Sequence, residues 1–282
     1  MKLPLNVDLK DKVVVVTGAG GILCSLFAKA VAKCGGKVAL LDLNLEAAEV
    51  YANEITAEGG VAKAYKANVL DKAIMEAVHA EVVRDLGTCD ILINGAGGNN
   101  PRATTTNEYY MPGDIESDVI SFFDLDAAGV EFVFNLNFLG TLIPTQVFAK
   151  DMVEKEDASI LNISSMNAYT PLTKIPAYSG AKAAISNFTQ WLAVHFSRTN
   201  IRVNAIAPGF FVTKQNEKLL FDEAGNPTPR SEKILNSTPM GRYGKDEELL
   251  GTMLYLLSKD ASSFVNGVVI PVDGGFSAYS GV

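Results

Sequence analysis

Three residues in the middle of the chain have the types and the spacing for proton transfer. Ser165 follows a short apolar run that indicates a buried strand, and Tyr178 and Lys182 lie in Ala-rich helical sequence. Positions i and i+4 share one face of a helix, so the phenol and the ammonium can point into the same space. A phenol has a pKa of about 10, which a nearby cation lowers by favouring the phenolate. The three residues are therefore a candidate general acid–base site.

The same three residues also have an ordinary structural explanation. They could be a loop serine, a buried tyrosine and an exposed helical lysine. A Tyr-x-x-x-Lys spacing occurs by chance in many chains, so the pair alone favours that explanation. Other parts of the chain must supply a reaction that needs an acid–base pair.

Composition limits the classes of protein that this chain can belong to. Its 282 residues are 48% hydrophobic, which suits one large globular domain. The net charge of −8 argues against nucleic acid or an anionic membrane as a main partner, although not against a small anionic substrate. The N-terminal sequence lacks a secretory signal, and no run of 18 apolar residues suggests a membrane span. We expect a cytoplasmic protein.

Cysteine and histidine usage predicts no metal site. Cys24, Cys34 and Cys89 are too few and too scattered for a disulfide framework or a zinc site, and they fit a reducing compartment. The only histidines, His79 and His195, lie in helix-like sequence with no cysteine cluster beside them. A metal-activated mechanism is therefore not expected.

The first forty residues predict a βαβ unit that binds a dinucleotide. A β-branched run over residues 13–16 leads into the turn Thr17-Gly18-Ala19-Gly20-Gly21, a helix over residues 22–33 and a strand that ends at Asp42. Glycines let the backbone approach a pyrophosphate, and the acid at the end of the second strand accepts hydrogen bonds from the adenosine ribose. No Arg or Lys follows in residues 43–45, so the sequence favours NAD over NADP.

Strand and helix patterns alternate through the rest of the chain, which predicts a single doubly wound parallel α/β sheet with helices on both faces. Helices are expected over residues 45–57, 73–86, 183–198 and 247–257, and strands over residues 62–67, 91–93, 160–163, 201–206 and 264–272. The strand at residues 91–93 opens into a second glycine cluster at residues 94–98, where a ligand could approach the sheet.

Two long segments without a clear period, residues 98–126 and 210–244, are expected to be substrate loops. Asp126 is a reasonable N-cap for the helix that follows the first segment. That helix carries Asn135 and Asn137 in apolar sequence, and such amides need hydrogen-bond partners.

Taken together, these motifs resemble the short-chain dehydrogenase/reductase family over nearly the whole chain. The resemblance rests on Thr17-Gly18, Asn94-Gly95-Ala96-Gly97, Asn137-x-x-Gly140-Thr141, Ser165, Tyr178-x-x-x-Lys182, Pro208-Gly209 with Thr213, and Val272-Asp273-Gly274-Gly275. It implies one Rossmann-type domain over residues 1–282 with a seven-stranded parallel sheet, assembled as a homotetramer.

The resemblance also implies a role for each matching residue. Tyr178 would be the general acid–base, Lys182 would bind the nicotinamide ribose and lower the phenol pKa, Ser165 would hydrogen bond the substrate oxygen, and Asn137 would hold a water in the proton relay. The residues expected to bind NAD are Thr17, Gly18, Gly20, Gly21, Ile22, Asp42, Asn68, Val69, Asn94, Gly95, Ala96, Tyr178, Lys182, Pro208, Gly209, Phe211 and Thr213.

The chain departs from the family pattern in two places. The usual turn is Thr-Gly-x-x-x-Gly-x-Gly, and its last two glycines fall on Ile22 and Cys24. The position at the adenine, where the family usually has an Asp, is occupied by Asn68 in this chain. Its amide can still form a hydrogen bond there.

Several segments are similar to the members of the family that act on D-mannonate and D-fructuronate. They include GILCSLFAK, INGAGGNNP, SSMNAYTPLTKIPAYS, APGFFVT and GGFSAYSGV. This similarity implies reversible hydride transfer between NAD and a sugar acid. A carboxylate substrate needs donors, for which Asn100, Arg102, Lys174 and Gln215 are candidates. The alternatives are another keto-sugar-acid or polyol dehydrogenase, such as a gluconate type, and a non-catalytic protein that senses dinucleotides.

Overall fold

The computed structural model, which describes residues 6–213 and 217–281, contains a seven-stranded parallel sheet. Its strands lie in the order β3-β2-β1-β4-β5-β6-β7. The strands are β1 (Val13–Thr17), β2 (Lys37–Asp42), β3 (Val61–Lys66), β4 (Ile91–Asn94), β5 (Ala158–Ile163), β6 (Ile201–Pro208) and β7 (Val269–Val272). Parallel strands with both faces covered read as continuous apolar runs, and β1 is buried at every residue.

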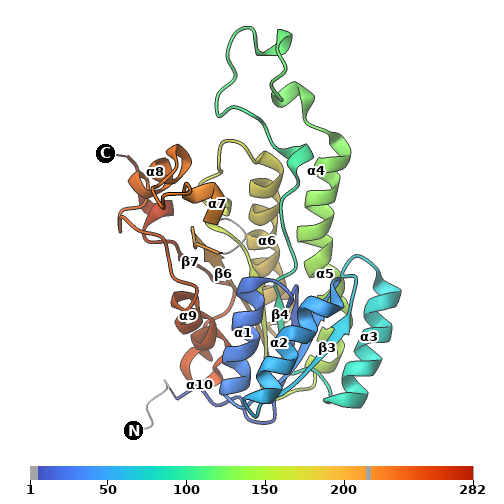
Figure 1. Cartoon of the computed structure of the whole chain (residues 1–282). Coiled ribbons are helices and arrows are strands. Elements are labelled where there is room, and N and C mark those ends of the chain that lie inside the picture. Colours follow the sequence, from blue (N-terminus) through green and yellow to red (C-terminus); the bar gives the residue numbers. More distant parts are fainter. Residues whose placement is uncertain (1–5, 214–216, 282) are drawn as a thin grey trace.

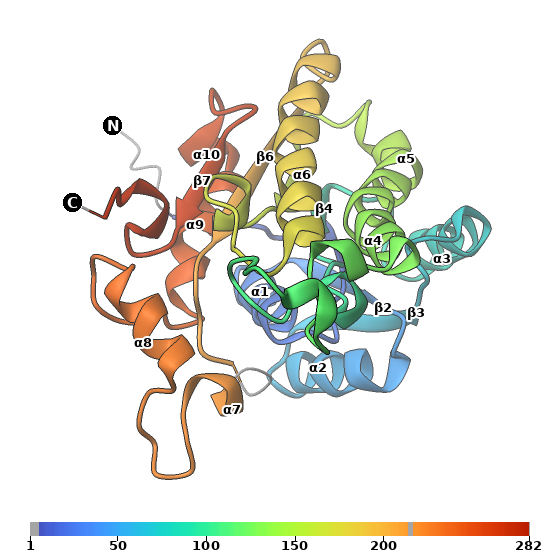
Figure 2. The same cartoon turned by 90° about the horizontal axis from the view of Figure 1, so that it is seen from above.

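Helices cover both faces of this sheet (Figures 1 and 2). They are α1 (Ile22–Lys33), α2 (Leu45–Ala57), α3 (Lys72–Asp85), α4 (Ala127–Phe134), α5 (Gly140–Met152), α6 (Pro176–His195), α7 (Glu217–Leu220), α8 (Pro229–Asn236), α9 (Glu248–Leu257) and α10 (Lys259–Ser262). Helices α1, α2 and α9 bury their apolar residues in one core cluster, and α3, α5 and α6 bury theirs in a second cluster on the other face. The predicted doubly wound α/β fold is confirmed.

The strand order reverses between β1 and β4, which places a crevice at the carboxyl ends of these two strands. Their register pairs Thr17 with Asn94, so the two glycine clusters that follow the strands lie side by side. Ligands bind at such switch points in open α/β sheets. The fold therefore brings both predicted glycine turns to one place.

Two elements differ from the expected boundaries. The last strand was expected over residues 264–272 but spans only Val269–Val272. Gly267 has φ of +81° and Phe264 is fully exposed, so the residues before β7 depart from regular strand geometry, although the Gly267 N–H still donates to the Val203 carbonyl oxygen of β6 at 2.8 Å. The helix after Asp126 is interrupted by a π-helical turn over Asn135–Leu139, for which the sequence carried no signal.

The helical stretch Ala127–Met152 is long and apolar enough to cross a membrane by length and composition alone. Half of its most apolar window is buried inside the structure. Residues 98–126, which precede it, extend beyond the sheet and its helices (Figure 1). This segment exposes large apolar side chains, among them Tyr109, Met111 and Phe122.

Candidate active site

Ser165, Tyr178 and Lys182 come together beyond the carboxyl end of β5. Ser165 begins a 3-10 turn, and Tyr178 lies in the first turn of α6, which starts at Pro176 because proline is favoured at that helix position. The Ser165 hydroxyl hydrogen bonds the Tyr178 phenol. The Lys182 Nζ lies over the Tyr178 ring, 5.6 Å from its centroid, and donates to the Ile163 carbonyl oxygen at 2.8 Å.

Burial dominates the electrostatics of this trio. Lys182 is 5% exposed, and burial lowers the pKa of its ammonium to about 8, although the Cys24 thiol nearby opposes the shift. Burial also raises the pKa of the Tyr178 phenol, while the hydrogen bond from Ser165 acts in the opposite direction. The sequence led us to expect a phenol pKa lowered by Lys182. In the structure without bound ligands, desolvation outweighs any such effect.

Asn137 enters the same site from the π-helical turn. Its side chain is buried, and its Nδ2 donates to the carbonyl oxygens of Gly98 and Val133, both at 2.8 Å. Its Oδ1 accepts from the Gly98 N–H at 3.3 Å. The amide in apolar helical sequence thus finds its partners in the second glycine cluster, and it ties α4 and α5 to the end of β4.

Gly97 lies between Asn137 and Lys182. A Cβ at this position would lie 2.6 Å from the Asn137 Oδ1 and 3.2 Å from the Lys182 Nζ. Real Cβ atoms do not approach other atoms as closely as 2.6 Å, so the Asn137 side chain would have to move, and the Lys182 ammonium would have to yield by a few tenths of an ångström. Only glycine leaves them in their present positions.

We expect Gly97→Ala to reduce kcat about 100-fold, because a displacement of about 1 Å in a catalytic group can cost that much. The measurement is steady-state turnover beside thermal unfolding. Gly98→Ala is the matched control, since its Cβ would meet only Leu136, at 3.8 Å. Equal activity of the two variants would contradict the proposed constraint.

Thr17 and Gly18 join the first glycine turn to the second. The Thr17 Oγ1 accepts from the N–H groups of Gly95 and Ala96 at 3.1 and 3.2 Å. Gly18 has φ of +67°, and a Cβ there would lie 2.9 Å from the Ala96 backbone. The Thr17 side chain therefore positions the second turn, and the close approach of the two backbones requires glycine.

The expected acid of the nucleotide site is held by backbone amides. The Asp42 Oδ2 accepts from the Gly20 N–H and its Oδ1 from the Asn44 N–H, both at 2.8 Å. Asp42 opens onto a surface groove lined by Asp42, Leu43, Asn44, Leu45, Glu46 and Lys66. Lys66 was not singled out in the sequence, because its proximity to Asp42 depends on strand pairing.

Side chains pack into the space beside the altered glycine turn. Gly21 is the extended N-cap of α1, and Ile22 is the first helical residue. Cys24 is buried, and a Cβ on Gly95 would lie only 2.1 Å from its Sγ. The thiol therefore occupies the space between α1 and the second glycine turn. Burial raises the pKa of Cys24 to about 12, which keeps the thiol protonated and unreactive.

The other expected cofactor residues are distributed around the same sheet edge. The Asn68 Oδ1 accepts from the Leu70 N–H at 3.1 Å, and Val69 packs close to Gly140. The Asn94 side chain points into a buried polar ladder. Its Nδ2 donates to Asn162 Oδ1 and Thr145 Oγ1, and the Asn162 Nδ2 donates to Thr189 Oγ1.

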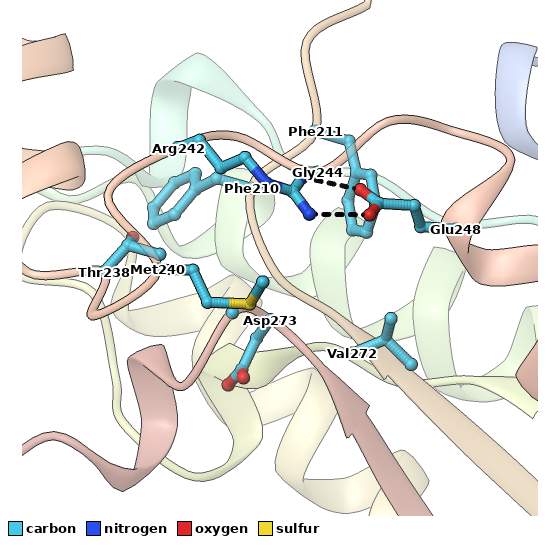
Figure 3. A pocket seen from close by; sticks show the side chains of 10 residues that line it. Phe210, Phe211, Thr238, Met240, Arg242, Gly244, Glu248, Val272 and Asp273 are labelled. Atoms are coloured by element: carbon cyan, nitrogen blue, oxygen red, sulfur yellow. Dashed lines mark hydrogen bonds and ion pairs between the residues drawn. The ribbon is translucent and has the colours of Figure 1, made fainter.

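Pro208 and Gly209 end β6 against the loop after β7. A Cβ at Gly209 would lie 2.5 Å from the Asp273 Cα. Behind them is a cavity of about 100 Å³ that the Phe211 ring lines beside Gly244 and the Arg242–Glu248 ion pair (Figure 3). The Phe211 side chain therefore has a packing role. The Thr213 carbonyl accepts from the Glu217 N–H at 2.9 Å and leads into α7.

The candidate substrate residues that the structure describes make contacts within the protein. Arg102 pairs with Asp126, the N-cap of α4, so its charge is already engaged. Asn100 caps a short 3-10 turn by accepting from the Arg102 N–H at 2.9 Å, and the Lys174 carbonyl accepts from the Thr105 N–H at 3.0 Å. Gln215 lies outside the described residues.

One ion pair connects the two long segments, residues 98–126 and 210–244. The Lys233 Nζ of α8 lies 2.8 Å from the Glu108 Oε1. The hydrogen bond from Lys233, together with the nearby charges of Lys174 and Arg230, lowers the pKa of the Glu108 carboxyl. Three cations, Lys233, Lys174 and Arg230, therefore act on the Glu108 carboxylate.

Comparison with known proteins agrees with this geometry. Residues 12–224 match the family model described as short chain dehydrogenase. A relative from Haemophilus influenzae, named an uncharacterized oxidoreductase, is 63% identical over 282 residues, which are 100% of this chain and 99% of that protein. The 5-keto-D-gluconate 5-reductase of Escherichia coli K12 is 31% identical over 268 residues, which are 95% of this chain and 96% of that protein.

A solved structure is similar over nearly the whole chain. It is a crystal structure from Haemophilus influenzae, provisionally named a D-mannonate oxidoreductase and holding bound NAD. It superposes with a TM-score of 0.95 at 64% sequence identity and covers 98% of this chain and 99% of its own.

Proposed function

Because the chain belongs to the short-chain dehydrogenase/reductase family of oxidoreductases, we propose that it interconverts D-mannonate and D-fructuronate with NAD as the cofactor. The observation that carries the chemistry is the meeting of Ser165, Tyr178, Lys182 and Asn137 beside two glycine turns. The choice of a sugar acid as substrate is supported by the similar protein provisionally named a D-mannonate oxidoreductase.

The residues present fit a dinucleotide. Gly18 and Gly95 leave the backbone free of side chains at the switch point, and α1 directs its N-terminus, capped by Gly21, toward the same crevice. Asp42 is fixed with its carboxylate at the groove expected for the adenosine ribose. NAD, when bound, supplies the hydride acceptor of the oxidation.

The chain's own groups then handle the proton. In alcohol oxidation, the Tyr178 phenolate takes the hydroxyl proton as the carbonyl forms, and in reduction the phenol returns it. Ser165, hydrogen bonded to the phenol, orients the substrate oxygen. Lys182 would stabilise the phenolate and hold the nicotinamide ribose when the cofactor is bound, and Asn137 would connect the site to a proton relay.

Segments 98–126 and 210–244 form the walls that receive the sugar acid in this proposal. Lys174 is the favoured partner of its carboxylate, since Arg102 is paired with Asp126 and Lys233 with Glu108. A buried or partly buried carboxylate needs such charge-assisted hydrogen bonds.

The protein also assembles as a homotetramer in the cytoplasm in this proposal. Helices α5 and α6 expose an apolar groove lined in part by Phe188, Trp191 and Phe196, and Trp191 is 56% exposed. Apolar exposure of this kind is typical of a contact between subunits. The free cysteines Cys24, Cys34 and Cys89 suit a reducing compartment.

A screen of NADH oxidation against keto-sugar acids tests the substrate. We expect D-fructuronate to give a kcat/KM at least about tenfold above that of 5-keto-D-gluconate, because matching hydroxyl contacts discriminate by that much or more. Preference for 5-keto-D-gluconate would support the gluconate-type alternative, which the 31% identical reductase favours. NADH binding without oxidation of any keto acid would support a dinucleotide sensor.

A further inference from the structure

Lys66 lies beside Asp42 at the groove expected to hold the adenosine ribose. Strands β2 and β3 pair in parallel, with Asp42 opposite Lys66 in the register. Side chains at paired positions project to the same face of a sheet. Two residues earlier on each strand, Leu40 and Ala64 both pack in the cluster beneath α1 and α2, which places Asp42 and Lys66 on this face too.

The groove offers a ligand one cation and two acids. Lys66 is exposed and lines it together with Asp42 and Glu46. Asp42 is held in place by the N–H groups of Gly20 and Asn44, so its charge cannot move away from a ligand. A ribose hydroxyl can donate to that carboxylate, whereas a phosphate on the same ribose would be repelled by it and attracted by the Lys66 ammonium.

We propose that Lys66 is a second determinant of cofactor choice, a cation placed to bind the 2′-phosphate of NADP(H), so that exclusion of this cofactor depends on Asp42. The inference rests on the proposed nicotinamide-dependent function and deepens it. The opposite charges of Asp42 and Lys66, at the ends of neighbouring strands, let the groove discriminate between NAD(H) and NADP(H). Removal of the Asp42 carboxylate leaves the Lys66 ammonium in place to bind the phosphate.

The test compares the full-length wild type with Asp42→Ser, Lys66→Ala and the double variant. Dissociation constants for NADH and NADPH are measured by fluorescence titration without sugar acid. Asp42→Ser is expected to weaken NADH binding and tighten NADPH binding, each about tenfold, as for one charge-assisted hydrogen bond. Adding Lys66→Ala should reverse the NADPH gain about tenfold and leave NADH unchanged.

Lys63→Ala in the Asp42→Ser background is the matched control. Lys63 lies on the same strand but on the opposite face of the sheet, where it pairs with Asp85. The Lys63→Ala substitution removes the same charge as Lys66→Ala but does not alter the groove. An equal loss of NADPH affinity in the Lys63 and Lys66 variants would overturn the proposal, and so would no loss in either.

Two further readouts separate the causes of a negative result. Adenosine 2′,5′-bisphosphate and AMP serve as competitors of NADH. Their affinities should differ only when Lys66 is present and Asp42 is absent. Normal NADH binding without this divergence would overturn the role of Lys66 and leave the proposed function intact. Failure of correctly folded wild type to bind either dinucleotide would overturn both. Lys66→Arg should retain NADPH binding in the Asp42→Ser background.

Discussion

Replacing Tyr178 by phenylalanine is expected to reduce turnover about 1,000-fold while NADH still binds, because a positioned general acid–base contributes about 10²- to 10⁴-fold. The substitution removes one hydroxyl and leaves the ring that packs beside Lys182. Steady-state rates in both directions and the dissociation constant for NADH are the measurements. A turnover near that of the wild type would rule out the proton-transfer role.

The pH profile gives this prediction a second readout. Burial raises the pKa of the Tyr178 phenol, so the group holds its proton at neutral pH. Ketone reduction consumes that proton and should proceed at neutral pH, then fall in alkali. Alcohol oxidation needs the phenolate and should rise as the pH rises. The residual activity of the phenylalanine variant should lose this dependence.

Tyr169→Phe is the matched control. Tyr169 follows the 3-10 turn that begins at Ser165, and its hydroxyl donates to the Val269 carbonyl oxygen at 2.8 Å. Its loss removes one hydrogen bond between this turn and β7, so stability should fall by about 1 kcal/mol with little change in kcat. Comparable losses of turnover in both variants would indicate a general structural disturbance and not the loss of a proton-transfer group.

Much of the fold could be predicted from the sequence, because strands buried on both faces are continuous apolar runs. The run at residues 13–16, the glycines after it and the acid at position 42 together specify a βαβ unit whose geometry the structure confirms. Tyr178 and Lys182 could be paired from helical spacing alone. These features depend on residues that are close in the sequence, so the order and spacing of residue types predict them directly.

Features that depend on tertiary contacts could not be predicted. The π-helical turn at Asn135–Leu139 has no distinctive composition, yet it places Asn137 against Gly98. Only the register of β2 and β3 brings Lys66 to Asp42. The Tyr178 pKa is raised by burial, whereas the sequence led us to expect a lowered one, because burial is a property of the whole packed site.

Replacing Lys182 by methionine is expected to change activity and stability in opposite directions. Turnover should fall about 100-fold or more, since the ammonium that favours the phenolate is lost. Stability at pH 7 should rise, because burial of the ammonium is unfavourable: its pKa falls from 10.5 to about 8 in the folded protein. A pKa shift of this size corresponds to a gain of about 3 kcal/mol in the free energy of unfolding. About 1 kcal/mol is subtracted from this gain because the variant loses the hydrogen bond to the Ile163 carbonyl oxygen.

The pH window of this effect follows from the two pKa values. Between pH 8 and 10.5 the unfolded chain holds a proton on Lys182 that the folded chain has released, so wild-type stability rises with pH across this range. Below pH 8 both states are protonated and the cost of the buried charge is constant. The advantage of the methionine variant should therefore be full at pH 7 and shrink between pH 8 and 10.5. Thermal unfolding of the ligand-free protein across this range is the measurement.

Lys72→Met separates this effect from the general gain of an apolar side chain. Lys72 lies on α3 and is exposed, so its ammonium is hydrated in both states and its replacement should change neither the melting temperature nor its pH dependence. A Lys182→Met variant that is less stable than wild type at pH 7 would show that the ammonium stabilises the fold. The opposite result would mean that the chain retains a costly buried cation for its chemistry, a trade between stability and activity that functional sites commonly show.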